Sequence, residues 1–295
     1  MSQTNGVSPA VTANPQTPPI SGGSMNRQWY AAPYALWMLL FTLVPLLFVV
    51  YYAFTNSQGG FTTANFLKIF QPGYLPVLVD SVKLALLCTA LCLLIGYPTA
   101  YFLASRDFSA NKILVVLILL PMWMNFLLRT YAMMTILENN GLLNTLLEKI
   151  GLKKMQIIGT EGAVLLGMVY NFLPFMVLPV YTALKKLDDR VIEAAEDLGA
   201  NPLRVVTRVV IPQSVPGVVS GITMVFMPAV TTFAITRLLS NGMIYLAGDM
   251  IEEYFITLNN RNLGSSISLV MLLLMLISTL LLRKANPDSE GGGLW

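Results

Sequence analysis

Six long apolar segments limit what this chain can fold into. They lie at residues 33–54, 78–104, 112–137, 160–184, 213–237 and 264–282. About 20 consecutive apolar residues form a helix long enough to cross a membrane. The chain is 55% hydrophobic and only 11% charged, whereas ordinary soluble domains carry about 25% charged residues. The sequence therefore predicts an all-α membrane protein with six transmembrane helices.

The polar residues exclude several classes of function. The chain has no histidine, so His-based catalysis and His metal ligands are excluded. Its net charge of +3, from 18 basic and 15 acidic residues, is too small to indicate a nucleic-acid partner. Cys88 and Cys92 lie four residues apart in an apolar segment, which predicts buried thiols rather than a disulfide or a metal site. We therefore expect no metal and no cofactor.

Enzymatic activity is not expected either. The sequence has no Gly-x-x-x-x-Gly-Lys-Ser/Thr loop for binding nucleotide phosphates. It also shows no arrangement of a serine or cysteine nucleophile with a base. Any ATP used by this protein must be hydrolysed by another chain.

The distribution of basic residues predicts the orientation in the membrane. With the N-terminus inside, the cytoplasmic segments contain ten basic residues: Arg27, Arg106, Lys112, Lys185, Lys186, Arg190, Arg204, Arg208, Arg283 and Lys284. The outer segments contain five: Lys68, Lys149, Lys153, Lys154 and Arg261. This bias favours cytoplasmic termini. We expect disordered cytoplasmic tails at 1–28 and 285–295, with the membrane domain at 29–284.

The most charged connection between apolar segments covers residues 186–212. Asp188 and Asp189 are suited to cap a short helix that runs to about Leu198. Gly199 follows where a left-handed cap ends such a helix. Asn201 and Pro202 begin a second helix, with Pro at its first position. Pro212 is expected to stop it, which leaves two short helices at a sharp angle.

This connection resembles the EAA loop of ABC importer permeases. The matching positions are Glu193, Ala194, Ala195, Gly199, Val209, Ile211 and Pro212. The family usually carries Ile and Leu where this chain has Val209 and Ile211. The resemblance implies a type I ABC importer permease of the MetI-like fold, a binding-protein-dependent inner-membrane component whose 186–212 loop couples to an ATPase. Pro202 belongs to the same coupling set.

The resemblance also implies partners and a location. The partners are a cytoplasmic ABC ATPase dimer, a second permease that is identical or a C-type paralogue, and an extracytoplasmic substrate-binding protein. The location is the bacterial plasma membrane, in contact with lipid, as a multi-pass protein. A stand-alone secondary transporter or channel is the rival interpretation, although that class does not require an EAA loop.

The third apolar segment resembles one branch of this family. It carries Pro121, Trp123, Asn125, Arg129 and Tyr131 in one run. This pattern is similar to the B-type permeases of spermidine/putrescine importers. Related permeases for iron, thiamine or opines share parts of it, so they stay as alternatives. Asn125, Arg129 and Tyr131 are candidates for the substrate pathway.

Two charged features have both a structural and a functional interpretation. Arg129 at membrane depth costs about 2.5–3.5 kcal/mol on insertion scales, so we expect it to pair with Asp80 or another carboxylate, or to line the pathway. Asp249, Glu252 and Glu253 form an acidic cluster in the segment 240–257, which is expected to be a re-entrant or surface helix. Carboxylates suit a polyammonium ligand, and a solvated face or a surface for the binding protein is the alternative.

Overall fold

The computed structural model describes residues 28–105 and 112–285, and these residues are mostly helical. They belong to two compact units, residues 1–47 and 48–295. The expected tails at 1–28 and 285–295 lie almost wholly outside the described residues. Gln28 already begins a helix, and the last helix reaches Ala285.

The described part of the first unit is a single apolar stretch of helix. It contains α1 (Gln28–Met38), the π-helical turn η1 (Leu39–Leu43) and the beginning of α2 (Val44–Ala53). The rings of Trp37 and Phe41 pack with their centroids 4.2 Å apart. From Pro33 to Ala53 the mean hydropathy is 2.2, and the helix is long enough to span a membrane. This agrees with the first predicted span.

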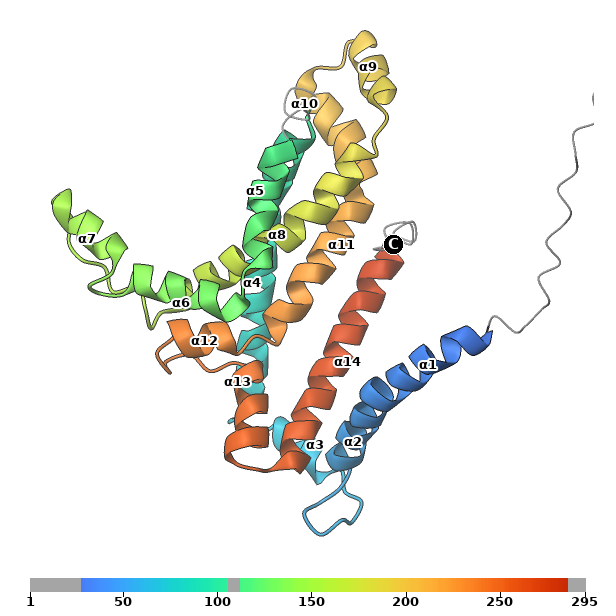
Figure 1. Ribbon diagram of the computed structural model, residues 1–295, viewed down its shortest axis with the longest axis vertical. Helices are drawn as coiled ribbons and strands as arrows, with labels where there is room; N and C mark the ends of the chain where they lie inside the picture. Colours follow the sequence, from blue (N-terminus) through green and yellow to red (C-terminus); the bar gives the residue numbers. More distant parts are fainter. Residues whose placement is uncertain (1–27, 106–111, 286–295) are drawn as a thin grey trace, which may run out of the picture. The chain divides into compact units, whose positions relative to one another are not determined.

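The core of the second unit is built by three helices that pack on one another: α4 (Leu75–Ala104), α8 (Glu161–Lys185) and α11 (Ile211–Val230) (Figure 1). Glycines allow their close approach. A Cβ at Gly217 would lie 2.5 Å from the Cβ of Ala183, and one at Gly221 would lie 2.7 Å from the sulfur of Met176. Small residues at helix contacts are typical of membrane bundles, where packing drives association.

Shorter elements and one further long helix surround this core. They are α3 (Ala64–Ile69), α5 (Lys112–Trp123), α6 (Phe126–Leu137), α7 (Leu142–Lys149), α9 (Asp189–Asp197), α10 (Pro202–Val205), η2 (Val206–Val210), α12 (Ala234–Leu239), α13 (Ala247–Glu252), η3 (Glu253–Thr257) and α14 (Arg261–Ala285). Among the described residues, five helices are long and apolar enough to cross a membrane, or up to six if the bent pair of α5 and α6–α7 counts as one span. The predicted class, an all-α membrane protein, is confirmed, with five to six candidate spans.

The third predicted span, 112–137, is not one straight helix. It breaks between Trp123 and Phe126, and the two parts are bent by 95°. Asn125 explains the break, because its side-chain oxygen accepts hydrogen bonds from Leu127 N (2.9 Å) and Leu128 N (3.3 Å) and so caps a new helix. The expectation that Arg129 lies further along a continuous span is therefore wrong.

The fifth predicted span, 213–237, is displaced toward the N-terminus. A continuous helical stretch covers Pro202–Val230, and α12 is separate from it. Pro212 does not stop the helix as predicted. The π-helical turn η2 ends at Val210, directly before the helical turn that holds Pro212. A wider turn leaves room for a proline ring and needs no N–H from it.

Candidate functional site

The connection at 186–212, which the sequence predicts to be cytoplasmic, folds as expected in its first half. Asp188 caps α9, since its side chain accepts a hydrogen bond from Arg190 N at 3.0 Å. Gly199 has φ +80°, the left-handed conformation that glycine adopts without strain. Asn201 caps α10 through a bond from Arg204 N at 2.9 Å, and Pro202 occupies the first turn. We call α9, α10 and the turn between them the coupling tip.

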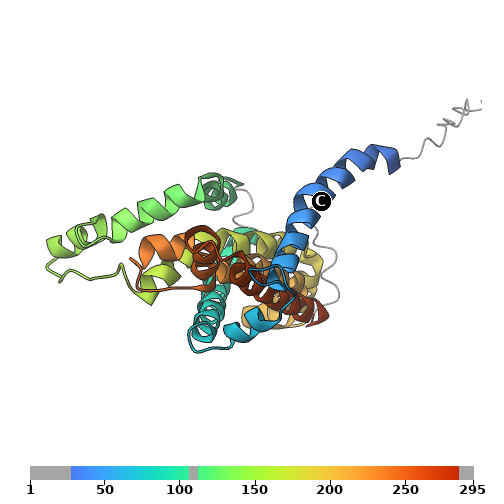
Figure 2. The same ribbon diagram turned by 90° about the horizontal axis from the view of Figure 1, so that it is seen from below.

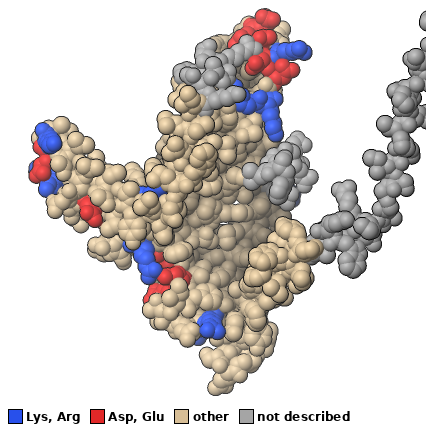
Figure 3. All heavy atoms as spheres, in the orientation of Figure 1, with Lys and Arg blue, Asp and Glu red and all other residues tan. Residues whose placement is uncertain are grey.

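The coupling tip exposes apolar side chains to its surroundings. Leu198 is 89% exposed and Leu203 is 71% exposed. Glu193 and Ala194 are also exposed, whereas Ala195 is half-buried and packs against the core. Charged side chains gather over α9, at the top of Figure 3 (Figure 3). An apolar patch surrounded by charges is the composition of a protein–protein contact surface.

The acidic cluster lies in a different arrangement from the one the sequence suggested. We call residues 231–257, which contain α12 and α13, the α12–α13 segment. Asp249 accepts hydrogen bonds from Thr236 Oγ1 (2.7 Å) and from Leu246 N (3.0 Å). Glu252 forms an ion pair of 2.7 Å with Arg237, and Glu253 accepts a hydrogen bond from Tyr245. All three carboxylates are half-buried and bound to neighbours, and a solvated face or a surface for the binding protein stays a prediction beside the polyammonium site.

Burial also changes proton affinities in this segment. Desolvation raises the pKa of Asp249, although the bonds from Leu246 and Thr236 oppose this effect. Desolvation, followed by the hydrogen bond with Tyr74, raises the pKa of Tyr254 to about 12. Burial and the bond to Glu253 likewise raise the pKa of Tyr245. Both phenols therefore stay protonated at neutral pH and can donate hydrogen bonds.

Arg129 is the least expected charge in the structure. It is only 5% exposed, and its Nε and Nη1 atoms have no hydrogen-bond partner. Asp80 is exposed, and no ion pair joins it to Arg129 within the described residues. The predicted pair is therefore wrong: once the chain bends at Asn125, Arg129 no longer continues the axis of α5.

The other two candidates of the third segment have different environments. Asn125 is the N-cap of α6, so its side-chain oxygen is used locally. Tyr131 is 54% exposed on α6. Between them, the buried Thr130 accepts a long bond of 3.4 Å from Asn171 of α8. The helix α6 packs against α8 and α12, which brings the Arg129 region to the base of the α12–α13 segment.

Several residues that hold the α12–α13 segment were not singled out from the sequence. The hydroxyl groups of Tyr74 and Tyr254 are 2.9 Å apart, and Ser81 Oγ accepts a bond of 2.7 Å from Ala247 N. Gly248 lies so close to the preceding turn that a Cβ there would be 2.4 Å from the carbonyl oxygen of Thr232. Tyr74 and Tyr254 are 180 residues apart, so no local sequence signal could have paired them.

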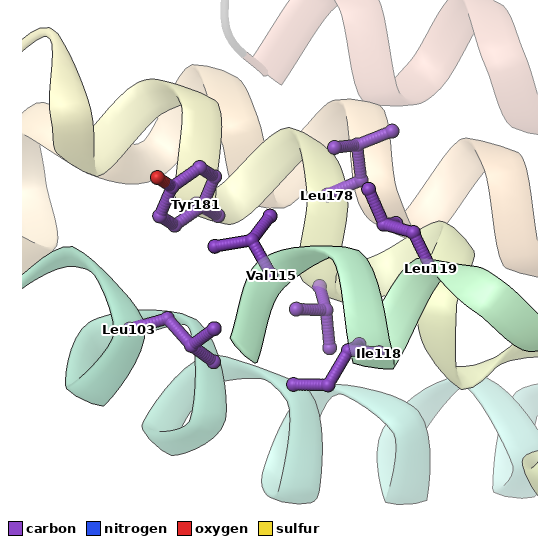
Figure 4. Close-up of a pocket in the computed structure, with 7 residues that line it drawn as sticks. Leu103, Val115, Ile118, Leu119, Leu178 and Tyr181 are labelled. Atoms are coloured by element: carbon purple, nitrogen blue, oxygen red, sulfur yellow. The ribbon is translucent and has the colours of Figure 1, made fainter. Parts of the chain in front are cut away.

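A small apolar pocket lies between α4, α5 and α8 (Figure 4). Its lining consists of Leu103, Val115, Ile118, Leu119, Val177, Leu178 and Tyr181. None of these side chains carries a charge at neutral pH, so the pocket offers no counterion to a charged solute.

The fold is shared with solved transport proteins. It is that of ABC importer permeases: a chain of a bacterial ABC transporter that imports the acidic polysaccharide alginate superposes with a TM-score of 0.70 at 18% identity, over 88% of this chain and 96% of that one. A chain of the MetNI methionine ABC transporter in an inward-facing conformation gives a TM-score of 0.52 at 16% identity, over 74% and 95%. The MetI-like fold expected from the EAA loop is confirmed.

Sequence comparison then identifies the family. Residues 94–288 match the model of the binding-protein-dependent transport system inner membrane component, and the chain belongs to this family. It is 36% identical to the spermidine/putrescine transport system permease protein PotB of Haemophilus influenzae over 258 residues, which cover 85% of this chain and 90% of that protein. PotB of Escherichia coli is 33% identical over 258 residues, covering 85% and 94%.

Proposed function

We propose that this chain is a permease subunit of an ATP-driven importer of polyamines such as spermidine and putrescine. The observation that carries this proposal is the 36% identity to a spermidine/putrescine permease over 85% of the chain. The family model, which matches residues 94–288, takes in the coupling tip and the α12–α13 segment. The chain would form half of the translocation pathway, with a second permease, either a C-type paralogue or a second copy, as the other half.

The coupling tip is proposed to bind a cytoplasmic ABC ATPase, one of a pair. Leu198 and Leu203 would enter a groove on that subunit, and Ala194 would let α9 approach closely because its side chain is small. Glu193, Ala195, Gly199, Pro202 and Pro212 complete the coupling set. The chain itself is not an enzyme in this proposal, because it lacks a phosphate-binding loop.

The α12–α13 segment is proposed to lie on the side where cargo arrives from an extracytoplasmic binding protein. Its three carboxylates, Asp249, Glu252 and Glu253, exceed its one cation, Arg237, so a polyammonium ion would be attracted there. The rings of Tyr245 and Tyr254 add faces suited to ammonium groups. Asn125 and Tyr131 stay candidates for the pathway, whereas an unpaired Arg129 would repel a cation.

The orientation can be tested by chemical labelling. Both termini and the coupling tip are proposed to be cytoplasmic. A cysteine in place of the exposed Asn201 should react with an impermeant maleimide only in inside-out vesicles. A cysteine in place of the exposed Asn241 should react only in right-side-out vesicles. The reverse pattern would overturn the orientation.

Reconstitution tests the substrate. The chain would be purified with its co-purifying subunits and its binding protein, then placed in vesicles that contain ATP. We expect uptake of labelled spermidine and putrescine that depends on ATP and on the binding protein. Labelled iron and thiamine serve as controls, because related permeases carry them. Uptake of iron or thiamine without polyamine would keep the permease assignment and reject the substrate.

A further inference from the structure

Three buried polar atoms that lack a hydrogen-bond partner lie at one contact, between α6 and α8. They are Nε and Nη1 of Arg129, on α6, and Oδ1 of Asn171, on α8. Among the described residues, the one other buried side-chain nitrogen or oxygen atom without a partner is Oγ of Ser265, on α14. Native proteins bond the large majority of their buried polar atoms. Three exceptions at a single helix contact therefore call for a common explanation.

Contacts across α6 and α8 show that the two side chains belong to neighbouring parts of these helices. Thr130, the residue after Arg129, accepts a hydrogen bond of 3.4 Å from Nδ2 of Asn171. The rings of Phe126 and Phe172 also join the two helices, with their centroids 6.4 Å apart. Figures 1 and 2 show α6 beside α8 and α12 (Figures 1 and 2). Consecutive Cα atoms are about 3.8 Å apart, and an arginine side chain is longer than that distance, so the guanidinium group of Arg129 can reach Asn171 without a change of fold.

No group from outside the chain reaches these three atoms in this conformation. Arg129 is 5% exposed, Asn171 is fully buried, and the unbonded atoms themselves are enclosed. A carboxylate of another subunit, a lipid phosphate and a cargo molecule are therefore excluded as their partners here. The atoms are chemically complementary to each other, since guanidinium nitrogens donate hydrogen bonds and an amide oxygen accepts them. The partner that each group lacks is thus present on the opposite helix.

The structure of this contact allows α6 to move relative to α8. The Thr130–Asn171 bond of 3.4 Å is longer than the 2.7–3.2 Å that is typical of N–H···O bonds. The helix α5 ends at Trp123 and α6 begins at Phe126, and the two non-helical residues between them separate axes that are bent by 95°. The ring contact at Phe126 is apolar, and such contacts are not directional. A small movement of α6 toward α8 is therefore compatible with the packing.

We propose that Arg129 and Asn171 form a hydrogen bond in one conformation of the transport cycle, and that this bond is broken in the conformation described here. Movement of α6 toward α8 would shorten the Thr130–Asn171 bond and bring a guanidinium N–H to Oδ1 of Asn171. A hydrogen bond to a charged group is among the stronger ones, so it would favour the closer arrangement roughly tenfold. Arg129 and Asn171 are positioning residues in this role. The inference rests on the proposed function, because it needs a permease that alternates between conformations.

Spin labels can test this bond in the assembled protein. The chain, with Cys88 and Cys92 replaced by alanine, would be reconstituted with its co-purifying subunits in lipid vesicles. Labels are placed at Leu128→Cys on α6 and Leu166→Cys on α8, because both leucines are exposed. The distance between the labels is measured without nucleotide and after trapping with ATP and vanadate. The control pair is Leu166→Cys with Val215→Cys on α11, which joins two helices of the packed core.

We expect the two conditions to differ in the population of a shorter α6–α8 distance and to give the same α8–α11 distance. Arg129→Met and Asn171→Leu should each reduce that population roughly tenfold, because each removes the same bond. The two substitutions together should reduce it no further. Thr130→Val, which removes only the long bond, should have a smaller effect. Thermal unfolding of each variant checks that it is folded.

Three results would overturn the proposal. The first is the same α6–α8 distance in both conditions. The second is an unchanged population in both single variants, which would show that enclosed water satisfies these atoms. The third is a double variant whose loss is the product of the two single losses. Uptake of labelled spermidine by the same vesicles tests the proposed function separately: no uptake together with the expected distances would reject the cargo and keep the bond.

Discussion

The coupling tip and the α12–α13 segment are both built from short helices, but they differ in where their leucines lie and in how their charged groups are bound. In the coupling tip, the large apolar side chains of Leu198 and Leu203 are exposed. In the α12–α13 segment, Leu239, Leu246 and Met250 are buried. Its acidic side chains are half-buried and bound to neighbours within the same segment.

This difference indicates how each region depends on other chains. Exposed leucines at a helix turn lose little if they stay in water but gain much when a partner covers them. The α12–α13 segment instead satisfies its own polar groups, so its shape does not require a partner. We infer that the coupling tip is completed by another protein, whereas the α12–α13 segment is a preformed part of this chain.

Replacing a glycine by valine should reduce the stability of the protein far more in the α12–α13 segment than in the coupling tip. In Gly248→Val the new Cβ would lie 2.4 Å from the Thr232 carbonyl oxygen, so we expect a loss of about 3 kcal/mol in stability. In Gly199→Val no atom lies within 4 Å, and only the φ of +80° is strained, at about 1–2 kcal/mol. Thermal unfolding in detergent should show a much lower midpoint for Gly248→Val.

Transport measurements then test whether the turn at Gly199 is needed for function. Gly199→Val should insert in the membrane normally but lose ATP-driven uptake, because the turn between α9 and α10 is altered. ATPase activity and uptake would be measured in reconstituted vesicles. Wild-type uptake by Gly199→Val would contradict the role of the turn, and a stable Gly248→Val protein would contradict the preformed segment.

Replacing an exposed apolar residue by glutamate should weaken binding of the ATPase at the coupling tip but not in the α12–α13 segment. Leu198→Glu places a charge where a partner would cover an apolar side chain, so we expect a loss of about 2 kcal/mol, roughly 30-fold, in binding to the ATPase. The midpoint of thermal unfolding should stay unchanged, since Leu198 is 89% exposed. Co-purification of the ATPase subunit measures the effect.

Met243→Glu is the matched control. Met243 is 80% exposed in the α12–α13 segment, so the substitution makes the same chemical change at a similar exposure. The control should retain the ATPase subunit at the wild-type level. Equal loss in both variants would show that added charge acts through solubility or expression, and not through the coupling tip.

Local signals in the sequence predicted local structure well. Asp188, Gly199 and Asn201 act on backbone groups within a few residues, so their caps could be read directly and are confirmed. Asn125 is also a local cap, but it lies inside an apolar run whose length favoured an unbroken helix. Pro212 predicts a stop by its own chemistry, and the π turn before it, which lets the helix continue, has no local signal in the sequence.

Contacts between distant segments could not be predicted in this way. The Tyr74–Tyr254 contact joins two residues that are 180 positions apart. The pairs of Asp249, Glu252 and Glu253 depend on how α12 and α13 face each other, which their spacing in the sequence does not state. The pair expected between Arg129 and Asp80 failed for the same reason, since it assumed a straight helix.

Arg129 differs from the other charged residues near the α12–α13 segment, because two of its nitrogen atoms are buried without a hydrogen-bond partner. A buried donor without a partner costs about 1–3 kcal/mol. Arg129→Met keeps an unbranched apolar stem and removes the two nitrogen atoms that have no hydrogen-bond partner, so it should raise the midpoint of thermal unfolding of the purified chain. Arg129→Lys is the control that keeps a charge and should give no such gain. A lower midpoint for Arg129→Met would show that the guanidinium group is held by a stabilising contact.

The smallest effect is expected from the acidic cluster. Replacing Asp249, Glu252 and Glu253 by Asn, Gln and Gln removes three charges from the side where polyamine is proposed to arrive. Charges at a surface act mainly on encounter, and salt weakens them because the screening length is about 8 Å at physiological ionic strength. If the cluster attracts cargo or the binding protein from solution, uptake should be slowed most at low salt.

A control variant must separate the attraction of cargo by the carboxylates from the loss of their ion pair and hydrogen bonds inside the α12–α13 segment. Arg237→Gln frees Glu252 from its 2.7 Å ion pair and leaves all three carboxylates in place, so it should keep or increase the attraction for a cation. Uptake of spermidine and of putrescine, each at low and high salt, would be measured for both variants. A defect that persists at high salt and is larger for spermidine, which carries more amines, would place the cluster in contact with cargo. Unchanged uptake in the triple variant under all four conditions would limit these carboxylates to holding the α12–α13 segment together.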